Sequence, residues 1–277
     1  MNTESKPDIM ELIKDMTLLD DIFMMQFFEN NKKCVEEILN TLLPFKISVE
    51  TVRVQYEFKV LKSRAVKCDI LAKDSENKRY NIEIQRRSDG AIPQRARYHS
   101  SMLDVKSLKP KQDFDEITDT YVIFITEHDV LKGNIPVYCV ERVILDPKKP
   151  IDQPSDRRFN DGSHIIYFNT AYKGDCDIEI KNLIHDFRCA EPEDMINESL
   201  AERFRELKYN PTKTEVDTMS EKYEERLKAE RAEGREEGRA EGRVEGRAEG
   251  RAEGRAEGHI EGRLEKARPA NKSQVGK

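Results

Sequence analysis

Two short alternating segments joined by a polar turn constrain the fold of this chain more than any other stretch. They span about residues 66–73 and 79–86, and Asp-Ser-Glu-Asn at 74–77 has the composition of a turn. The two segments are therefore predicted to be paired strands. Successive residues of a strand point to opposite faces, so pairing the apolar faces brings Asp69 and Glu83 to the same side.

The two faces of this predicted hairpin differ in chemistry. Gln85 lies two residues beyond Glu83 on the polar side. Two carboxylates flanked by apolar residues are costly to bury as unpaired charges, and a divalent metal ion would compensate them. The alternative is a solvated cross-strand pair of acids on an exposed sheet face. The apolar face is formed by Val66, Cys68, Ile70 and Ala72 on the first strand, and by Tyr80, Ile82 and Ile84 on the second.

The spacing of Asp69 and Glu83-Ile84-Gln85 resembles the metal-binding core of the PD-(D/E)XK nuclease superfamily. With its surroundings the chain looks most like the recombination-promoting nuclease and transposase branch, which carries E-x-Q where most of the superfamily has E-x-K. The resemblance covers roughly the first two thirds of the chain. It is carried by DDIFMMQFF (20–28), NIEIQRR (81–87), RARYHSSML (95–103), YVIFITEHDV (121–130) and IPVYCVERV (135–143).

The resemblance implies a metal-dependent DNA endonuclease that hydrolyses phosphodiester bonds with little sequence specificity and promotes DNA recombination or transposition. Its catalytic residues would be Asp69, Glu83 and Gln85. The metal ligands would be Asp69, Glu83 and the carbonyl oxygen of Ile84, an oxygen set that suits Mg²⁺, with Mn²⁺ as a substitute. Such an ion activates water and neutralises charge on the phosphate. Gln85 can orient the attacking water through its amide but brings no positive charge.

Several basic side chains are candidates for contacting DNA phosphates or for supplying the missing charge. Taken singly, each is equally an ordinary solvated residue. Asp21 is a candidate auxiliary acid for the metal, with compensation of a helix dipole as the alternative. Tyr98 is predicted to lie in the core, and the five histidines show no ligand spacing. The basic candidates are Lys67, Arg86, Arg87, Arg95 and Arg97, with Lys73 as a further source of charge and Lys106, Lys109 and Lys111 along the DNA path.

The order of predicted elements indicates an α/β (α+β) fold, which agrees with the restriction-endonuclease-like mixed sheet flanked by helices that the resemblance implies. Two N-terminal helices precede the hairpin, and the second ends at Pro44. A strand over 47–58 with a slip near Val52 comes next, Pro93 opens a helix, and TYVIFIT at 120–126 is a buried strand. Extra strands are predicted at 136–145 and 164–168, and a closing helix at 178–187.

The C-terminal part repeats Arg-x-Glu-Gly every four residues from Arg231 to Gly262, with His259 as the departure at the arginine position. Each glycine costs a helix about 1 kcal/mol relative to alanine, and the i,i+4 neighbours carry like charges. The repeat is therefore predicted to be a mobile, charge-balanced tail. The predicted organisation is a nuclease-like domain at 1–190, a charged helical extension at 191–230 and this tail at 231–277.

Composition limits the remaining function classes. The formal net charge is −6, so no global basic field indicates DNA binding. No segment approaches the roughly 20 apolar residues of a membrane span, and the first residues lack a signal-peptide core. The chain has five cysteines and no C-x-x-C pair, which is typical of a protein in a reducing compartment. This pattern predicts neither a disulfide framework nor a zinc site. We expect a cytoplasmic protein that binds DNA and no membrane.

Two other function classes stay open at this point. The nuclease fold is compatible with a DNA- or protein-binding module whose cleavage was weakened or lost through Gln85. The repeat tail is compatible with a self-associating scaffold, in which case the protein would be a homo-oligomer and deletion of residues 231–262 would abolish the oligomers.

Overall fold

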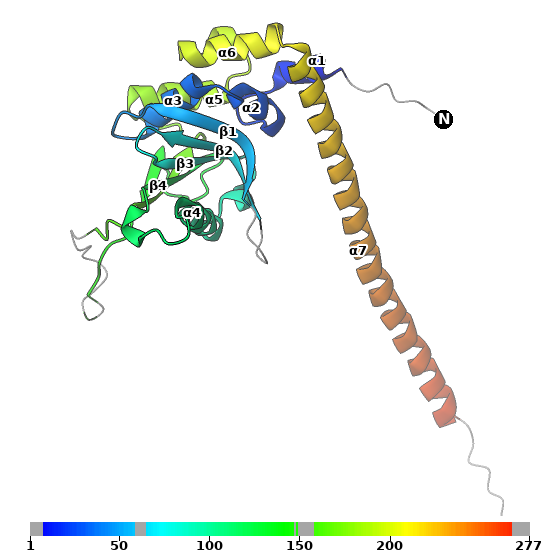
Figure 1. The fold of residues 1–277 in the computed structure, drawn as a ribbon. Coiled ribbons are helices and arrows are strands. Elements are labelled where there is room, and N and C mark those ends of the chain that lie inside the picture. Colours follow the sequence, from blue (N-terminus) through cyan, green and yellow to red (C-terminus); the bar gives the residue numbers. More distant parts are fainter. Residues whose placement is uncertain (1–7, 59–64, 147, 149–157, 268–277) are drawn as a thin grey trace, which may run out of the picture. The chain divides into compact units, whose positions relative to one another are not determined.

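A six-stranded mixed sheet forms the centre of the protein (Figure 1). The computed structural model describes residues 8–58, 65–146, 148 and 158–267. The strand order is β1-β2-β3-β4-β6-β5; β1, β2 and β3 are antiparallel neighbours, β3, β4 and β6 are parallel, and β5 pairs antiparallel with β6. The strands are β1 Val49–Phe58, β2 Val66–Asp74, β3 Arg79–Gln85, β4 Thr120–Thr126, β5 Val137–Val140 and β6 Ser163–Asn169.

Helices cover both faces of this sheet (Figure 1). α4 lies on one face, against β4 and β6, whereas α2, α3 and α5 lie on the other. All seven residues of β4 are buried, as expected for a parallel strand with helices on both sides. The helices are α1 Ile9–Leu12, α2 Asp21–Phe28, α3 Lys32–Leu42, α4 Pro93–Ser107, α5 Ile178–Arg188, α6 Glu198–Tyr209 and α7 Lys213–Ala267, with short 3₁₀ turns at Ile13–Asp15, Ser88–Ala91, Phe114–Glu116 and Pro192–Asp194.

The predicted α/β fold class is confirmed. The hairpin and the buried strand lie where alternation and the apolar run placed them, and Pro93 is the first residue of α4. The predicted strand at 136–145 is shorter, because only Val137–Val140 forms a ladder with β6. Tyr98 is not in the core: 37% of the residue is exposed.

The repeat segment is helical, and here the prediction of a non-helical chain is wrong. α7 runs without a break through the repeat. The three other residues of each repeat are mainly Arg, Glu and Ala, which are among the best helix formers, and their preference outweighs the glycines. By its contacts the chain divides into the units Met1–Ser220 and Glu221–Lys277. Mobility of the repeat segment stays a prediction.

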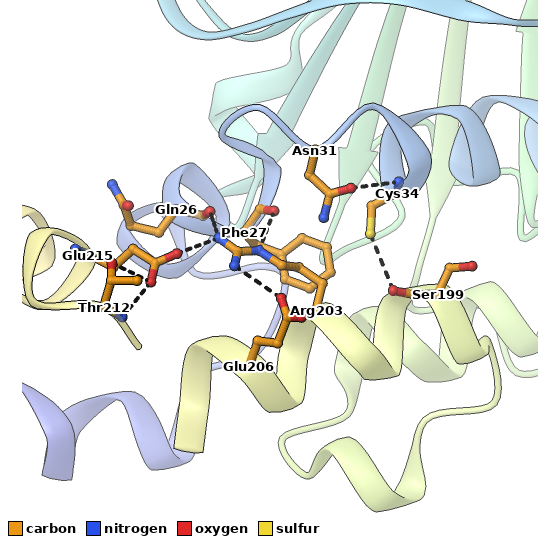
Figure 2. A network of polar contacts seen from close by, with 9 residues as sticks. All are labelled: Gln26, Phe27, Asn31, Cys34, Ser199, Arg203, Glu206, Thr212 and Glu215. Carbon is orange, nitrogen blue, oxygen red and sulfur yellow. Dashed lines mark hydrogen bonds and ion pairs between the residues drawn. The ribbon is translucent and has the colours of Figure 1, made fainter. Parts of the chain in front are cut away.

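Arg203 on α6 joins three helices of the first unit (Figure 2). It donates to the backbone carbonyls of Gln26, at 2.8 Å, and Phe27, at 3.4 Å, in the last turn of α2. It also donates to the carboxylates of Glu215 at 2.7 Å and Glu206 at 3.4 Å. The last carbonyls of a helix lack intrahelical partners, so this guanidinium satisfies groups that would otherwise be desolvated without a hydrogen bond.

We expect the Arg203→Met variant to unfold with a free energy about 2 kcal/mol lower than the wild type, because buried acceptors and Glu215 lose a charged donor. Arg205→Met is the matched control. Arg205 lies on the same helix, is 46% exposed and contacts Glu193 at 3.4 Å, so its loss costs little. Urea denaturation of both variants measures the difference, and equal values for the two would contradict this role of Arg203.

Within the part of the chain that the structure describes, every helix is too short or too polar to cross a lipid bilayer.

Candidate active site

Asp69 and Glu83 meet where the β2–β3 ladder ends. The paired residues of the ladder run to Ile70 and Ile82. At the next residues, carboxylate oxygens take the place of backbone carbonyls as acceptors between the two strands. The Asp69 N–H donates to Glu83 Oε1 at 3.3 Å, and the Ile84 N–H donates to Asp69 Oδ2 at 3.0 Å. Each carboxylate therefore accepts a hydrogen bond from the backbone of the opposite strand. This interlocking brings the two acids of the sequence motif together.

Ile84 and Gln85 lie beside this pair. The Ile84 N–H is directed at β2, and the N–H and C=O of one strand residue point to the same edge, so the Ile84 carbonyl also points to the edge of β3 that faces β2. The Gln85 backbone carbonyl points the other way and accepts from the Glu127 N–H at 3.0 Å. The Gln85 Oε1 atom lies 3.4 Å from Arg95 Nη1.

α4 contributes two side chains to Glu83. Arg95 Nη2 lies 2.8 Å from Glu83 Oε2, and His99 Nδ1 lies 3.4 Å from Glu83 Oε1. Arg95 and His99 are four residues apart, which places them on the same face of the helix. Arg95 also donates to the Gly90 carbonyl at 3.0 Å. One guanidinium thus contacts Glu83, Gln85 and the turn that follows β3.

β1 supplies a third contact to the acids. Gln55 Nε2 donates to Asp69 Oδ1 at 3.3 Å, and the Gln55 backbone has φ +53°. A positive φ is uncommon for a residue other than glycine, and such strained positions concentrate at functional sites. The strain turns Gln55 toward Asp69.

The electrostatics of the pair favour a bound cation. Glu83 is fully buried. Burial, followed by the negative charge of Glu83, raises the pKa of Asp69 to about 7, against the lowering effects of the Ile84 N–H, Arg95 and Gln55. The surrounding donors therefore do not fully compensate the charge of the Asp69 carboxylate. A divalent ion between their oxygens would relieve this repulsion, so the residues present fit such an ion.

The raised pKa of Asp69 predicts a pH dependence of stability in the absence of divalent ions. The pKa of the Asp69 side chain is about 3.8 in the unfolded chain and is raised to about 7 in the folded protein. Between these values the folded protein retains a proton that the unfolded chain has released, so the free energy of unfolding falls as pH rises from about 4 to about 7. Asp69→Asn removes this term, so its stability relative to wild type should grow with pH. Thermal unfolding in EDTA measures the difference; a gap that does not change with pH would contradict the assignment.

A family model described as PD-(D/E)XK nuclease family transposase matches residues 22–171. The match spans more than half of the 277 residues. It includes Asp69, Glu83, Gln85 and all of α4. The chain belongs to this family. No curated protein and no solved structure matches it.

The basic residues singled out in this family member separate into two groups. Lys67, Arg95 and Arg97 line one cavity of about 720 Å³ beside α4. Arg86 pairs instead with Asp20 and Glu127, and Arg87 with Asp89. Three of the first five basic candidates therefore share one cavity beside α4.

Asp21 is the first residue of α2 and is exposed. Its Oδ1 accepts the Ile22 N–H at 2.9 Å, a contact that fits the helix-dipole interpretation. Its role as an auxiliary acid stays a prediction.

The expected position of Cys68 is wrong. Alternation placed it on the apolar face with Ile70, but its Sγ lies near Glu83 and His99, and it shares a core cluster with Leu71. Arg53 and Tyr56 line the same pocket although they are three residues apart, whereas regular alternation would place them on opposite faces. The alternation of β1 therefore breaks between them, at Gln55. Cys68 pairs with Tyr56 immediately after that break, so the face of β2 changes there as well.

Sequence reasoning assigned no role to Gln55 and His99 of this family member. His99 had a detectable signal, because it lies one helical turn after Arg95 on a helix predicted to pack against the motif strands. Gln55 had none, since its position depends on a local backbone distortion.

Proposed function

We propose that this PD-(D/E)XK family member is a Mg²⁺-dependent endodeoxyribonuclease that cleaves DNA with little sequence preference in the cytoplasm, and that its cuts promote recombination or transposition. The observation that carries the proposal is the interlocked pair of the half-buried Asp69 and the fully buried Glu83 at the end of the β2–β3 ladder. The family membership adds the reaction class. Mn²⁺ is expected to replace Mg²⁺.

The Asp69 and Glu83 carboxylates and the Ile84 carbonyl would hold the ion. When bound, a divalent ion polarises the phosphodiester and activates water. Each carboxylate oxygen has two lone pairs, so Glu83 can keep its contacts to Arg95 and the Asp69 N–H while it binds the ion. Gln55 and the Ile84 N–H hold Asp69 in the required orientation.

Arg95 supplies the positive charge that Gln85 lacks. Most of the superfamily has lysine at the position of Gln85, and here Arg95 Nη1 lies 3.4 Å from Gln85 Oε1. Gln85 can orient the attacking water by its amide, while Arg95 stabilises negative charge that develops on the phosphate. Lys67 and Arg97 on the same cavity would hold the flanking phosphates.

A plasmid-relaxation assay tests the proposal. The purified full chain should convert supercoiled plasmid to nicked circles with Mg²⁺ or Mn²⁺ and not in EDTA, and Asp69→Ala should abolish the conversion. Asp21→Ala separates the two interpretations of that residue: a reduced rate assigns it to the metal, and an unchanged rate to the helix dipole. A wild-type protein that never nicks DNA, or an equally active Asp69→Ala variant, would refute the nuclease assignment.

We expect Gly90→Ala to reduce cleavage about 100-fold, because a displacement of about 1 Å in a catalytic group has an effect of this order. A Cβ at Gly90 would overlap Gln85 Oε1, so the Gln85 amide would have to move. Gly234→Ala is the control, since a Cβ there meets nothing within 4 Å. Nicking rates of the two variants check the prediction; full activity of Gly90→Ala would show that the position of Gln85 is unimportant.

A further inference from the structure

A second set of metal-binding atoms lies beside the carboxylate pair. Cys68 of β2, Glu83 of β3 and His99 of α4 are all buried, and one potential ligand atom of each lies within 4.8 Å of the others. Three different elements contribute, and the nearest two ligands in sequence are 15 residues apart. The cysteine and histidine spacing therefore gave no sign of this cluster.

The donor atoms differ from those of the Mg²⁺ site. Sulfur and imidazole nitrogen favour Zn²⁺ and related transition-metal ions, whereas Mg²⁺ takes oxygen. Zn–S and Zn–N bonds of about 2.3 and 2.0 Å place the ligand atoms of a tetrahedral site about 3.5 Å apart. The observed spread of up to 4.8 Å is wider than this, so the ligand atoms would have to draw together around a bound ion.

Asn81 provides an independent observation. It lies on β3 two residues before Glu83, on the same face, and is fully buried. Its Nδ2 is 2.9 Å from His99 Nδ1, while its Oδ1 has no hydrogen-bond partner among the residues that the structure describes. An unpaired buried amide oxygen is costly. As a fourth ligand it would complete a four-coordinate set of sulfur, nitrogen and two oxygens.

The cluster is reachable from outside. His99 lines the cavity of about 720 Å³ together with Lys67 and Gly90. Cys68 and Glu83 do not line this cavity, so His99 is the member of the cluster that borders it.

We propose that Cys68, Glu83 and His99, with the Asn81 amide oxygen, form a binding site for a thiophilic divalent ion of the Zn²⁺ type. Glu83 belongs to both this site and the Mg²⁺ site, so the two ions compete for its carboxylate. Zn²⁺ at the second site withdraws Glu83 and inhibits DNA cleavage. The inhibition rests on the proposed nuclease function, whereas the binding does not.

Cobalt titration of the metal-free full chain tests the binding. Co²⁺ bound by a thiolate gives a charge-transfer band in the near ultraviolet. The wild type should develop this band with one equivalent of Co²⁺ and lose it on addition of Zn²⁺ but not Mg²⁺. Cys68→Ala and His99→Gln should abolish or weaken it. Cys34→Ser is the matched control, because Cys34 is also buried but lies at the start of α3, where its Sγ contacts the Ser199 carbonyl.

A wild type without the band, or a band that survives in Cys68→Ala, would overturn the site. Circular dichroism shows whether each variant is folded, and His99→Gln gives a second readout if Cys68→Ala is not. For inhibition, the ratio of nicking rates with and without one equivalent of Zn²⁺ should be well below one for wild type and near one for Cys68→Ala. Equal ratios would refute the regulatory role. A wild type that binds Co²⁺ but never nicks DNA would refute the nuclease and leave the site standing.

Discussion

Glu83→Gln is expected to lower the rate of Mg²⁺-dependent DNA cleavage by about three orders of magnitude, since a metal ligand contributes several kcal/mol of transition-state stabilisation. The substitution removes one negative charge and keeps the shape of the side chain. Arg95 and the Asp69 N–H contact different oxygens of Glu83 in the wild type, so the single amide oxygen of the variant can accept from only one of them. Circular dichroism of the variant therefore accompanies the rate measurement, to show that the loss of cleavage is not a loss of the fold.

Glu127→Gln is the matched control for this loss. Glu127 follows β4, pairs with Arg86 and is 23% exposed, so its charge is outside the metal site. In Glu83→Gln, both the single-turnover nicking rate and the Mn²⁺ affinity measured by isothermal titration should fall. In Glu127→Gln, neither quantity should change. Wild-type Mn²⁺ affinity in Glu83→Gln would mean that Glu83 is not a ligand.

Arg95→Met is expected to lower the free energy of unfolding by about 3 kcal/mol at neutral pH in EDTA, because it leaves a fully buried carboxylate without its charged partner. The Arg95 guanidinium lies 2.8 Å from Glu83 Oε2, and Glu83 has no exposed surface. A divalent ion on Glu83 would replace part of this compensation. Saturating Mn²⁺ should therefore restore stability more in Arg95→Met than in wild type.

Arg97→Met serves as the comparison, because Arg97 lies on the same helix and lines the same cavity but is exposed. It should change stability by less than about 0.5 kcal/mol. Urea denaturation with and without Mn²⁺ measures both effects. Equal stabilities of the two variants in EDTA would show that Glu83 does not need the guanidinium.

The fold could be predicted where local patterns determine it. The hairpin follows from alternation and from the turn composition at 74–77, and β4 from an uninterrupted apolar run, because both patterns depend on neighbouring residues alone. The register of that hairpin predicts that Asp69 and Glu83 lie on the same side. The paired residues of the ladder end one step earlier, at Ile70 and Ile82.

Features that depend on tertiary contacts could not be predicted in the same way. Arg95 was a candidate phosphate contact, but its partners Glu83 and Gln85 lie on a strand that only the packing of α4 brings near. Cys68 changes face because of a distortion at Gln55 on the adjacent strand. The helix α7 differs from the sequence prediction for another reason. The summed helix preference of Arg, Glu and Ala over the whole repeat exceeds the summed cost of its glycines.

The most direct test of the account is the location of Mn²⁺ in crystals of the metal-loaded wild type, by anomalous scattering at the manganese edge. We predict one strong peak within bonding distance of the carboxylate oxygens of both Asp69 and Glu83, with the Ile84 carbonyl as a further ligand. A well-occupied ion elsewhere, with the carboxylates of Asp69 and Glu83 contacting protein groups alone, would contradict it.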